Sequence, residues 1–285
     1  MRERGLVETI IGVDRDGDVL ARAVALGVID DSASTLEAGA NDADLIILST
    51  PVGAMAEISA ALASAAADGA LIIDVGSVKG VVAEAAKAFS DRVHFVPCHP
   101  VAGTEQSGPE AGFASLFQDR WCILTPLERE DAPYKSAIER AAQLWADVGA
   151  QVEIMSAAHH DLALAVTSHL PHLIAFTLVG AADDVESVAQ GEVVKYSAGG
   201  FRDFTRIAAS DPVMWRDVFL NNRDAVLEVL GRFSEELAVM QRAIRWGDAK
   251  ALEDAFARGR SLRRAIVEAG QETAAPNFGR DDKPR

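Results

Sequence analysis

Residues 70–80 read Ala-Leu-Ile-Ile-Asp-Val-Gly-Ser-Val-Lys-Gly. The run Ala70–Val75 is apolar at every position except Asp74, so both faces of an extended chain would be apolar in its middle. Strands of this kind occur in parallel sheets that are covered by helices on both sides. A small residue, a hydroxyl and an Ala-rich segment follow directly, in the order of a strand, a turn and a helix. This stretch therefore predicts an α/β fold.

The same alternation of apolar runs and Ala-rich helical stretches extends in both directions along the chain. Gly27 and Gly69 are typical of the residue that ends a helix, and they close stretches that begin near Gly17 and Ala54. The predicted strands are Thr9–Val13, Asp44–Ser49, Ala70–Val75, Val93–Val96, Trp121–Thr125 and Gln151–Ile154. We therefore expect a parallel sheet with covering helices over residues 1–155.

From Ser156 onward the apolar residues recur at helical spacing, and no strand is predicted. Asn221–Arg245 and Ala249–Val267 are long amphipathic stretches that can pack within the chain or against a second subunit. We expect an all-helical domain over residues 156–270 and a homodimer formed through it. The tail, residues 271–285, is rich in polar residues and is predicted to be disordered.

The composition excludes several classes of function. A hydrophobic share of 49% in 285 residues fits a globular chain of two domains. A net charge of −16 argues against a nucleic-acid-binding surface, which needs clustered lysine and arginine. Cys98 and Cys122 are too few for a disulfide framework and lack the paired spacing of a zinc site, so no metal is expected. No apolar run reaches the length of a signal peptide or membrane span, and we expect a cytoplasmic protein without a membrane partner.

A dinucleotide-binding fold normally begins with a strand and a G-x-G-x-x-G turn, where the next helix receives the pyrophosphate. The sequence contains no such motif, and residues 1–6 read as the last turn of that helix. We therefore expect the first strand and its Gly-rich loop to be missing, so that a Rossmann-like sheet is incomplete at its N-terminus. Asp14 would then follow the second strand, where a carboxylate binds the ribose hydroxyls of NAD and repels the extra phosphate of NADP. Arg15 belongs to the same predicted site, although Asp14 would serve equally as a turn residue or helix cap.

Two further strand ends carry small or polar residues where open α/β sheets bind their ligands. Ser49, Thr50 and Pro51 follow one strand, and Gly76 and Ser77 follow the next. We expect all five to line the cofactor site. The alternatives are a helix that begins at a proline and a serine that only caps a helix.

Residues 98–105 read Cys-His-Pro-Val-Ala-Gly-Thr-Glu at the end of another predicted strand. His99 precedes a proline in a Gly-containing loop at the carboxyl edge of the sheet. An imidazole in this position is suited to proton transfer, so His99 is the main catalytic candidate.

Five motifs taken together resemble the prephenate and arogenate dehydrogenases. They are Asp74-x-Gly76-Ser77-x-Lys79, His99-Pro-x-Ala-Gly103-Thr-Glu105, His160-Asp161, Ser168-His169-Leu170-Pro171-His172 and Gly200-Phe201-Arg202-Asp203-Phe204-Thr205-Arg206. They occur in the family's order and spacing over most of the chain. The resemblance implies a Rossmann-like α/β domain followed by an all-α helical domain, with NAD as cofactor. It also implies oxidative decarboxylation of prephenate or arogenate in tyrosine biosynthesis, and the choice between these substrates stays open.

The same resemblance implies roles for individual residues. His99 would accept the proton of the substrate hydroxyl, and Ser77 would orient His99 or the substrate. Arg206 would clamp the substrate carboxylate, a task that suits a planar guanidinium. The other residues implied to bind the substrate are Glu105, His160, Ser168 and His172.

Helical spacing supports part of this assignment. Ser168 and His172 are four residues apart and therefore share one helix face. Pro171 removes one backbone hydrogen bond and is predicted to kink the helix, which would aim His172 at the substrate. His159 and His169 are interpreted equally well as core residues, and Arg206 as a surface residue paired with an acidic neighbour.

Two other functions are compatible with the sequence. A β-hydroxy acid dehydrogenase has a similar domain order, but it uses a lysine early in its helical domain, and here the first lysine of that region is Lys195. A non-catalytic binding protein derived from the same scaffold would explain the absent Gly-rich motif. The complete set of downstream polar residues favours the enzyme.

Overall fold

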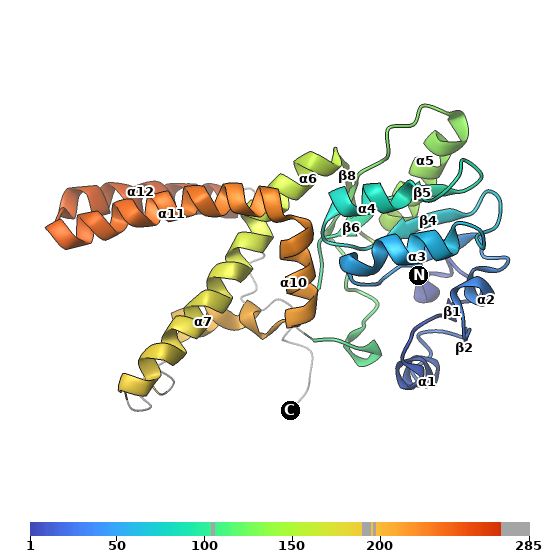
Figure 1. The fold of residues 1–285 in the computed structure, drawn as a ribbon, viewed down its shortest axis with the longest axis horizontal. Helices are drawn as coiled ribbons and strands as arrows, with labels where there is room; N and C mark the ends of the chain where they lie inside the picture. Colours follow the sequence, from blue (N-terminus) through green and yellow to red (C-terminus); the bar gives the residue numbers. More distant parts are fainter. Residues whose placement is uncertain (104–105, 190–194, 196–197, 269–285) are drawn as a thin grey trace. The chain divides into compact units, whose positions relative to one another are not determined.

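The computed structural model describes residues 1–103, 106–189, 195 and 198–268. The chain divides into two compact units, Met1–Val229 and Leu230–Arg285, which are described separately (Figure 1). The first unit extends beyond the expected boundary at residue 155 because later helices pack on the strand-containing part. Helix α6 (Ala157–Leu164) contacts α4 (Lys79–Ala86), and α10 (Pro212–Asn221) contacts the short helix η2 (Val52–Ala54). The tail predicted to be disordered lies outside the described residues.

The strands form three small sheets. They are β1 (Ile11–Gly12), β2 (Asp31–Ser32), β3 (Leu45–Leu48), β4 (Leu71–Asp74), β5 (His94–Val96), β6 (Cys98–Pro100), β7 (Trp121–Leu124) and β8 (Gln151–Ile154). Their orders are β1-β2, β3-β4-β5 and β6-β7-β8, and every pair is parallel except β6 with β7. Each predicted strand overlaps an observed one. Strands β2 and β6 were not predicted, because they are short and Asp31-Ser32 and Cys98-His99-Pro100 lack an apolar run.

The helices agree with the apolar spacing of the sequence. In the first unit they are η1 (Arg2–Arg4), α1 (Gly17–Ala25), α2 (Leu36–Ala40), η2, α3 (Met55–Leu62), α4, η3 (Pro109–Ala111), α5 (Ala132–Asp147), α6, η4 (Ala165–His169), α7 (Leu170–Ala189), α9 (Gly199–Thr205), η5 (Arg206–Ala209) and α10. Helix α11 (Arg223–Trp246) runs from the first unit into the second, which also contains α12 (Ala249–Ile266). Gly27, with a φ of 69°, directly follows the C-cap of α1, as predicted. Gly69 was predicted to close the helix that begins near Ala54, but α3 ends at Leu62, and Gly69, with a φ of 79°, lies in a later turn.

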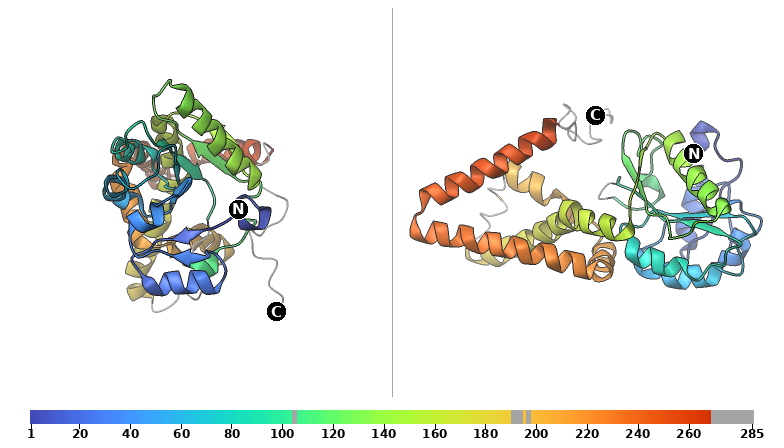
Figure 2. Two further views of the ribbon diagram at one scale, coloured as in Figure 1. Left: turned by 90° about the vertical axis from the view of Figure 1, so that its right-hand side faces the viewer. Right: turned by 90° about the horizontal axis from the view of Figure 1, so that it is seen from above.

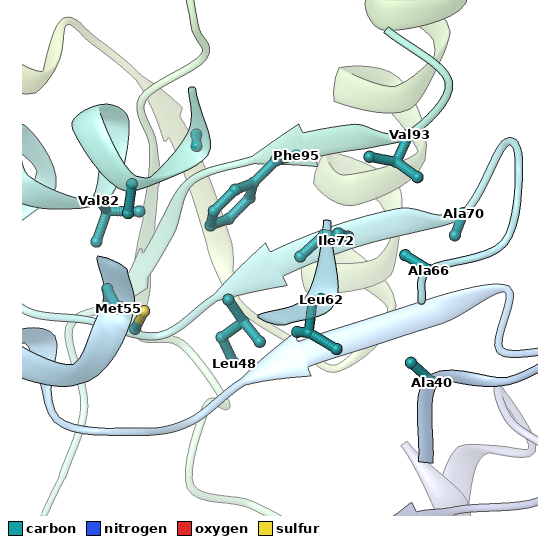
Figure 3. Close-up of a cluster of buried hydrophobic side chains, with 12 residues drawn as sticks. Ala40, Leu48, Met55, Leu62, Ala66, Ala70, Ile72, Val82, Val93 and Phe95 are labelled. Atoms are coloured by element: carbon teal, nitrogen blue, oxygen red, sulfur yellow. The ribbon is translucent and has the colours of Figure 1, made fainter. Parts of the chain in front are cut away.

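Alternate residues of the central strands face different helices. Ile72 on β4 packs with Phe95, Leu62 and Val82 in a core beneath α3 and α4 (Figure 3). Its neighbours Leu71 and Ile73 belong to a second core, which contains the residues of α5. Figure 2 shows α5 and the α3–α4 pair on opposite sides of these strands. The apolar sequence of β4 is explained by this burial on both faces.

The register of the central sheet brings the predicted ligand-binding strand ends to one edge. Strand β3 pairs with β4 so that Leu48 lies opposite Asp74. The next residues, Ser49-Thr50-Pro51 and Val75-Gly76-Ser77, therefore leave the sheet side by side. This edge is where open α/β sheets bind ligands.

The segment Ala157–Asp184 forms a continuous helical run that includes the π-helical turn η4. Pro171 lacks a backbone N–H and was therefore predicted to distort the helix. The π-helical turn η4 lies just before it and is such a local distortion. By length and composition, with a mean hydropathy of 1.7, the run would be able to cross a membrane, but a core helix of a soluble protein passes the same test. Its buried polar side chains His160, Asp161 and His169 favour a role inside a folded domain.

The second unit, within its described residues, consists of the C-terminal part of α11 and the helix α12, joined by a tight turn at Gly247. Gly247, with a φ of 66°, ends α11, and the carboxylate of Asp248 caps the N-terminus of α12 by accepting from the N–H of Ala251. Arg258 and Glu236 form an ion pair of 3.4 Å between the two helices. Ala249, Leu252, Phe256 and their neighbours line an open apolar groove along one face of α12.

Candidate active site

A buried ion pair underlies the end of β4. Lys79 and Asp74 are both fully buried, and the Nζ of Lys79 donates to the Oδ2 of Asp74 and, at 2.7 Å, to the carbonyl of Cys98. The other carboxylate oxygen accepts the N–H of Cys98 at 2.9 Å, and Oδ2 also accepts the N–H of Gly76 at 2.8 Å. An ion pair this deep is tolerated only because every charge is hydrogen-bonded. It joins the end of β4 to the start of β6, and this places His99 beside α4.

His99 lies on β6 with its ring directed at a second histidine. Its Nδ1 is 2.8 Å from the Nε2 of His160, and the two rings meet edge to face at 5.0 Å between centroids. The Nδ1 of His160 is in turn 2.8 Å from the Oδ1 of Asp161. Among the described residues the structure shows no hydrogen bond to the Nε2 of His99. This nitrogen is therefore available to a ligand.

Asp161 is held by the first turn of α4. The N–H of Lys79 donates to its Oδ1 at 2.7 Å, and the N–H of Gly80 donates to its Oδ2 at 2.8 Å. A carboxylate at a helix N-terminus satisfies N–H groups that have no partner within the helix. Asp161 thus caps α4 from a helix more than 80 residues away in sequence.

Burial keeps the histidines of this cluster neutral. Desolvation lowers the pKa of His99 well below its usual 6.5, and the neighbouring His160, Lys79 and His169 lower it further. Desolvation also lowers the pKa of His160, against the opposing effect of its hydrogen bond to Asp161. Both rings therefore remain neutral near pH 7, and a neutral imidazole is the form that accepts a proton.

The adjacent strand ends have the features of a nucleotide site. The Oγ1 of Thr50 is buried without a hydrogen-bond partner, so it is left to bind a ligand. A Cβ on Gly76 would approach Val52 and the Asp74 carboxylate to 2.9 Å, so only glycine fits there. Asp14 and Arg15 are exposed after β1, and one oxygen of Asp14 accepts the N–H of Asp16 at 2.8 Å. The strand ends that were predicted to bind the cofactor thus include one unpaired buried hydroxyl and one position restricted to glycine.

His172, which was predicted to bind the substrate, is held by two contacts. Its Nδ1 donates to the carbonyl of Ser168 at 2.8 Å, and its ring stacks on Trp215 at 3.7 Å between centroids. Desolvation lowers the pKa of His172, and the nearby charge of Arg206 contributes to this shift. Arg206 is exposed at the start of η5.

The two remaining histidines of this helix differ. His169 is fully buried, and its Nδ1 accepts from the side-chain amide of Asn222 at 3.0 Å, so it is a core residue. The same amide donates to the carbonyl of Asp161 at 2.8 Å. His159 is exposed, and its interpretation as a core residue is therefore wrong.

His160 is the main difference from the expected site. It was predicted to line the substrate pocket, but it is completely buried, and both ring nitrogens contact protein groups. It therefore has no polar atom left for a substrate. Glu105 lies outside the described residues, and Ser77 is half-buried beside Gly76.

Sequence reasoning missed the residues that support the site. Asp161 and Lys79 were named as members of sequence motifs but were given no role. Trp215 and Asn222 were not named at all. The adjacency of His160 and Asp161 was a usable signal, because a carboxylate next to a histidine can orient its ring. Nothing in the sequence indicated that Trp215 would meet His172.

Models of two protein domains match the chain. Residues 1–154 match the nucleotide-binding domain of prephenate dehydrogenase, and residues 156–258 match its dimerization domain. The chain belongs to the prephenate dehydrogenase family.

Several named proteins are similar to this chain over most of its length. A cyclohexadienyl dehydrogenase of Zymomonas mobilis is 40% identical over 258 residues, which cover 90% of this chain and 87% of the relative. A crystal structure of prephenate dehydrogenase from A. aeolicus, in complex with hydroxyphenyl propionate and NAD+, superposes with a TM-score of 0.82 at 35% identity. It covers 93% of this chain and 91% of the other. An arogenate dehydrogenase from Synechocystis has a TM-score of 0.72 at 26% identity and covers 93% of each chain.

Membership of the prephenate dehydrogenase family accounts for the order of the elements. A Rossmann-like nucleotide-binding region precedes a helical region, as the five sequence motifs implied. The predicted fold class is therefore confirmed.

Proposed function

We propose that this protein catalyses the NAD-dependent oxidative decarboxylation of prephenate or arogenate in tyrosine biosynthesis. The observation that carries the proposal is His99, a buried neutral imidazole with Nδ1 engaged by His160 and Nε2 available to a ligand. It lies beside strand ends with the features of a nucleotide site. The named relatives act on the same class of substrate, a cyclohexadienol with a ring carboxylate.

In this proposal the Nε2 of His99 accepts the proton of the substrate's ring hydroxyl. The bound NAD supplies the acceptor for the hydride from the same ring carbon. The bond between the ring and its carboxylate then breaks, carbon dioxide leaves, and the bond's electron pair completes the aromatic ring. The carbonyl oxygen takes the proton back from His99 and becomes a phenol, so His99 is restored.

Arg206, His172 and Ser168 are the proposed substrate-binding residues described by the structure. Arg206 offers a permanent cation for a carboxylate, and its charge already acts on His172. Because the Nδ1 of His172 donates to Ser168, its Nε2 is the nitrogen that can bind the substrate. Glu105, which follows β6 in the sequence, is also proposed to bind the substrate and would lie near its side-chain end.

NAD is the proposed cofactor, held along the carboxyl edge of the strands. Asp14 would accept hydrogen bonds from the ribose hydroxyls, with Arg15 beside it. Ser49, Thr50 and Pro51 would contact the nicotinamide half, and Gly76 and Ser77 would let the backbone approach it closely. The unpaired Oγ1 of Thr50 and the restricted space at Gly76 support this arrangement.

Residues 1–155 are proposed to bind the nucleotide, and residues 156–270 to bind the substrate and form a homodimer. Leu162 and Val166 are one helical turn apart on α6 and η4 and are 41% and 52% exposed. A second copy would cover this apolar face, in keeping with the dimerization domain that the helical residues match. Light scattering should show a dimer that dissociates when Val166→Glu is introduced. A monomeric wild type would contradict the proposal.

A cytoplasmic location is also proposed, from the net charge of the chain and the polar residues within its most apolar helical run. The net charge of −16 gives no attraction to anionic lipids. In addition, the apolar run of α6–α7 contains buried histidines and Asp161, whose insertion in lipid would be costly.

The deciding experiment measures NADH formation by the purified chain with NAD and either prephenate or arogenate. Growth of absorbance at 340 nm with one substrate, in step with release of carbon dioxide, supports the proposal and identifies the preferred substrate. A chain that binds NAD and either compound without forming NADH would overturn it.

A further inference from the structure

Asp161 is a buried carboxylate that the proposed reaction does not use. It accepts three N–H groups, from the backbones of Lys79 and Gly80 and from the ring of His160. Within the part of the chain that the structure describes, its side chain forms no hydrogen bond with Arg206, His172 or Ser168, which are proposed to bind the substrate. If Asp161 served only to cap α4, nothing would require His160 to lie between Asp161 and His99.

The donor and the acceptor of each hydrogen bond in the series Asp161, His160 and His99 follow from chemistry. A carboxylate only accepts hydrogen bonds, so the Nδ1 of His160 must carry the proton. A neutral His160 then has a bare Nε2, which can only accept. The Nδ1 of His99, 2.8 Å away, must therefore be the donor. His99 is left with a bare Nε2, which is the nitrogen that would face the substrate.

We propose that Asp161 is a positioning residue, which fixes the proton-accepting tautomer of His99 through His160. This inference rests on the proposed function for its catalytic consequence, but the tautomer itself is a property of the protein alone. Without the carboxylate, His160 is free to protonate at Nε2 and donate to His99. His99 would then carry its proton at Nε2 and would be unable to accept another from a substrate.

The surroundings disfavour a charged His160 as an alternative donor. Desolvation of this fully buried ring is the largest effect on its pKa and lowers it, and the cation of Lys79 acts in the same direction, against the opposing effects of Asp161 and Asp74. Asp74 is the other nearby acid, but it is already bound to Lys79. The nearby His169 is neutral as well, because burial lowers its pKa to about 4.

The direct test is nitrogen NMR of the wild-type protein labelled with 15N-histidine, at pH 7.5 and without ligands. The chain has six histidines, and the variants His99→Leu and His160→Leu assign the two signals of interest. Both rings should be protonated at Nδ1 and bare at Nε2, whereas free neutral histidine favours the opposite tautomer. A proton on the Nε2 of His99 would overturn the proposal.

A kinetic cycle tests whether Asp161 acts through His160. Asp161→Ala should lower kcat by about 10²-fold or more, with little change in KM, as when a triad histidine loses its orienting carboxylate. In a His160→Leu background, Asp161→Ala should have little further effect on kcat, because the hydrogen bonds that link Asp161 to His99 through His160 are already lost. Additive losses would show that Asp161 acts only by stabilising the fold.

Asp131→Ala is the matched control for the loss of a helix cap. Asp131 caps α5 by accepting the N–H of Tyr134 at 2.9 Å and does not contact the histidine cluster. Its loss should lower the melting temperature, as is also expected for Asp161→Ala, while kcat and the His99 tautomer should stay unchanged. If Asp161→Ala fails to fold, the wild-type NMR result still decides the tautomer.

The outcomes separate this inference from the proposed function. The predicted tautomers without NADH formation from either substrate would retain the role of Asp161 and reject the reaction. NADH formation with the opposite tautomer at His99 would retain the reaction and reject the role of Asp161.

Discussion

The ring of His172 stacks on Trp215, with centroids 3.7 Å apart and planes inclined by 25°. The Nδ1 of His172 is bound to the Ser168 carbonyl, so stacking and hydrogen bond together determine where the Nε2 points. Trp215 itself is buried and also packs against Phe219. A residue of α10 thus orients a proposed substrate ligand on α7.

Replacing Trp215 with alanine should remove this support. Loss of a buried tryptophan is expected to cost about 3–5 kcal/mol of unfolding free energy. The KM for the substrate should rise, because the ring of His172 becomes free to rotate. Urea unfolding and steady-state kinetics measure the two effects. Trp246→Ala is the control, since Trp246 is 79% exposed and its loss should change neither quantity.

His99→Asn tests the proton acceptor. The variant should lose about 10²- to 10⁴-fold in kcat, the usual contribution of general base catalysis. Its affinity for NAD, measured by calorimetry, should stay near the wild-type value. The exposed His159 provides the control variant His159→Asn. Turnover close to the wild-type rate in His99→Asn would exclude His99 as the base.

Arg206→Gln tests the carboxylate clamp. Removing a charged hydrogen bond should raise the KM for prephenate or arogenate by about tenfold to a hundredfold. Arg202→Gln, one turn earlier on α9, removes the same charge and is expected to have little effect. An unchanged KM in Arg206→Gln would assign the carboxylate to another residue.

Asp14→Ala tests the choice of nucleotide. The ratio of kcat/KM for NAD to that for NADP should fall by about tenfold, because the carboxylate no longer binds the ribose or repels the phosphate. Asp18→Ala, in the first turn of α1, removes a nearby charge without touching the predicted site. Equal ratios in Asp14→Ala and the wild type would place ribose recognition elsewhere.

The buried histidines predict acid sensitivity. Burial lowers the pKa of His169 from 6.5 to about 4, so the unfolded chain binds a proton that the folded chain does not. This contribution to stability is complete above pH 6.5 and is lost as the pH falls toward 4, by up to about 1.4 kcal/mol per pH unit. Urea unfolding between pH 7.5 and 4.5 measures it. His169→Asn should show a shallower loss than wild type, and His159→Asn should not; equal slopes would contradict this origin.

Most of the fold was predictable because it depends on local patterns. The apolar run at Leu71–Ile73 and the polar positions after it required a buried strand and a ligand-binding edge. The short strand β6 was not predictable, since Cys98-His99-Pro100 pairs with β7 through contacts distant in sequence.

The roles of His99, Arg206 and Asp14 could be proposed from residue type and motif. The role of His160 could not, because burial and two hydrogen bonds decide it. One of these joins residues 61 positions apart.

The sequence alone determined the α/β order and the helical C-terminal half, and it pointed to His99 as the proposed proton acceptor, because apolar periodicity and motif spacing are local properties. Only the tertiary structure decided that His160 and Asp161 lie behind His99 and that Trp215 lies behind His172. These contacts depend on how α6 and α10 pack on the nucleotide-binding region, and such packing is set by the whole core.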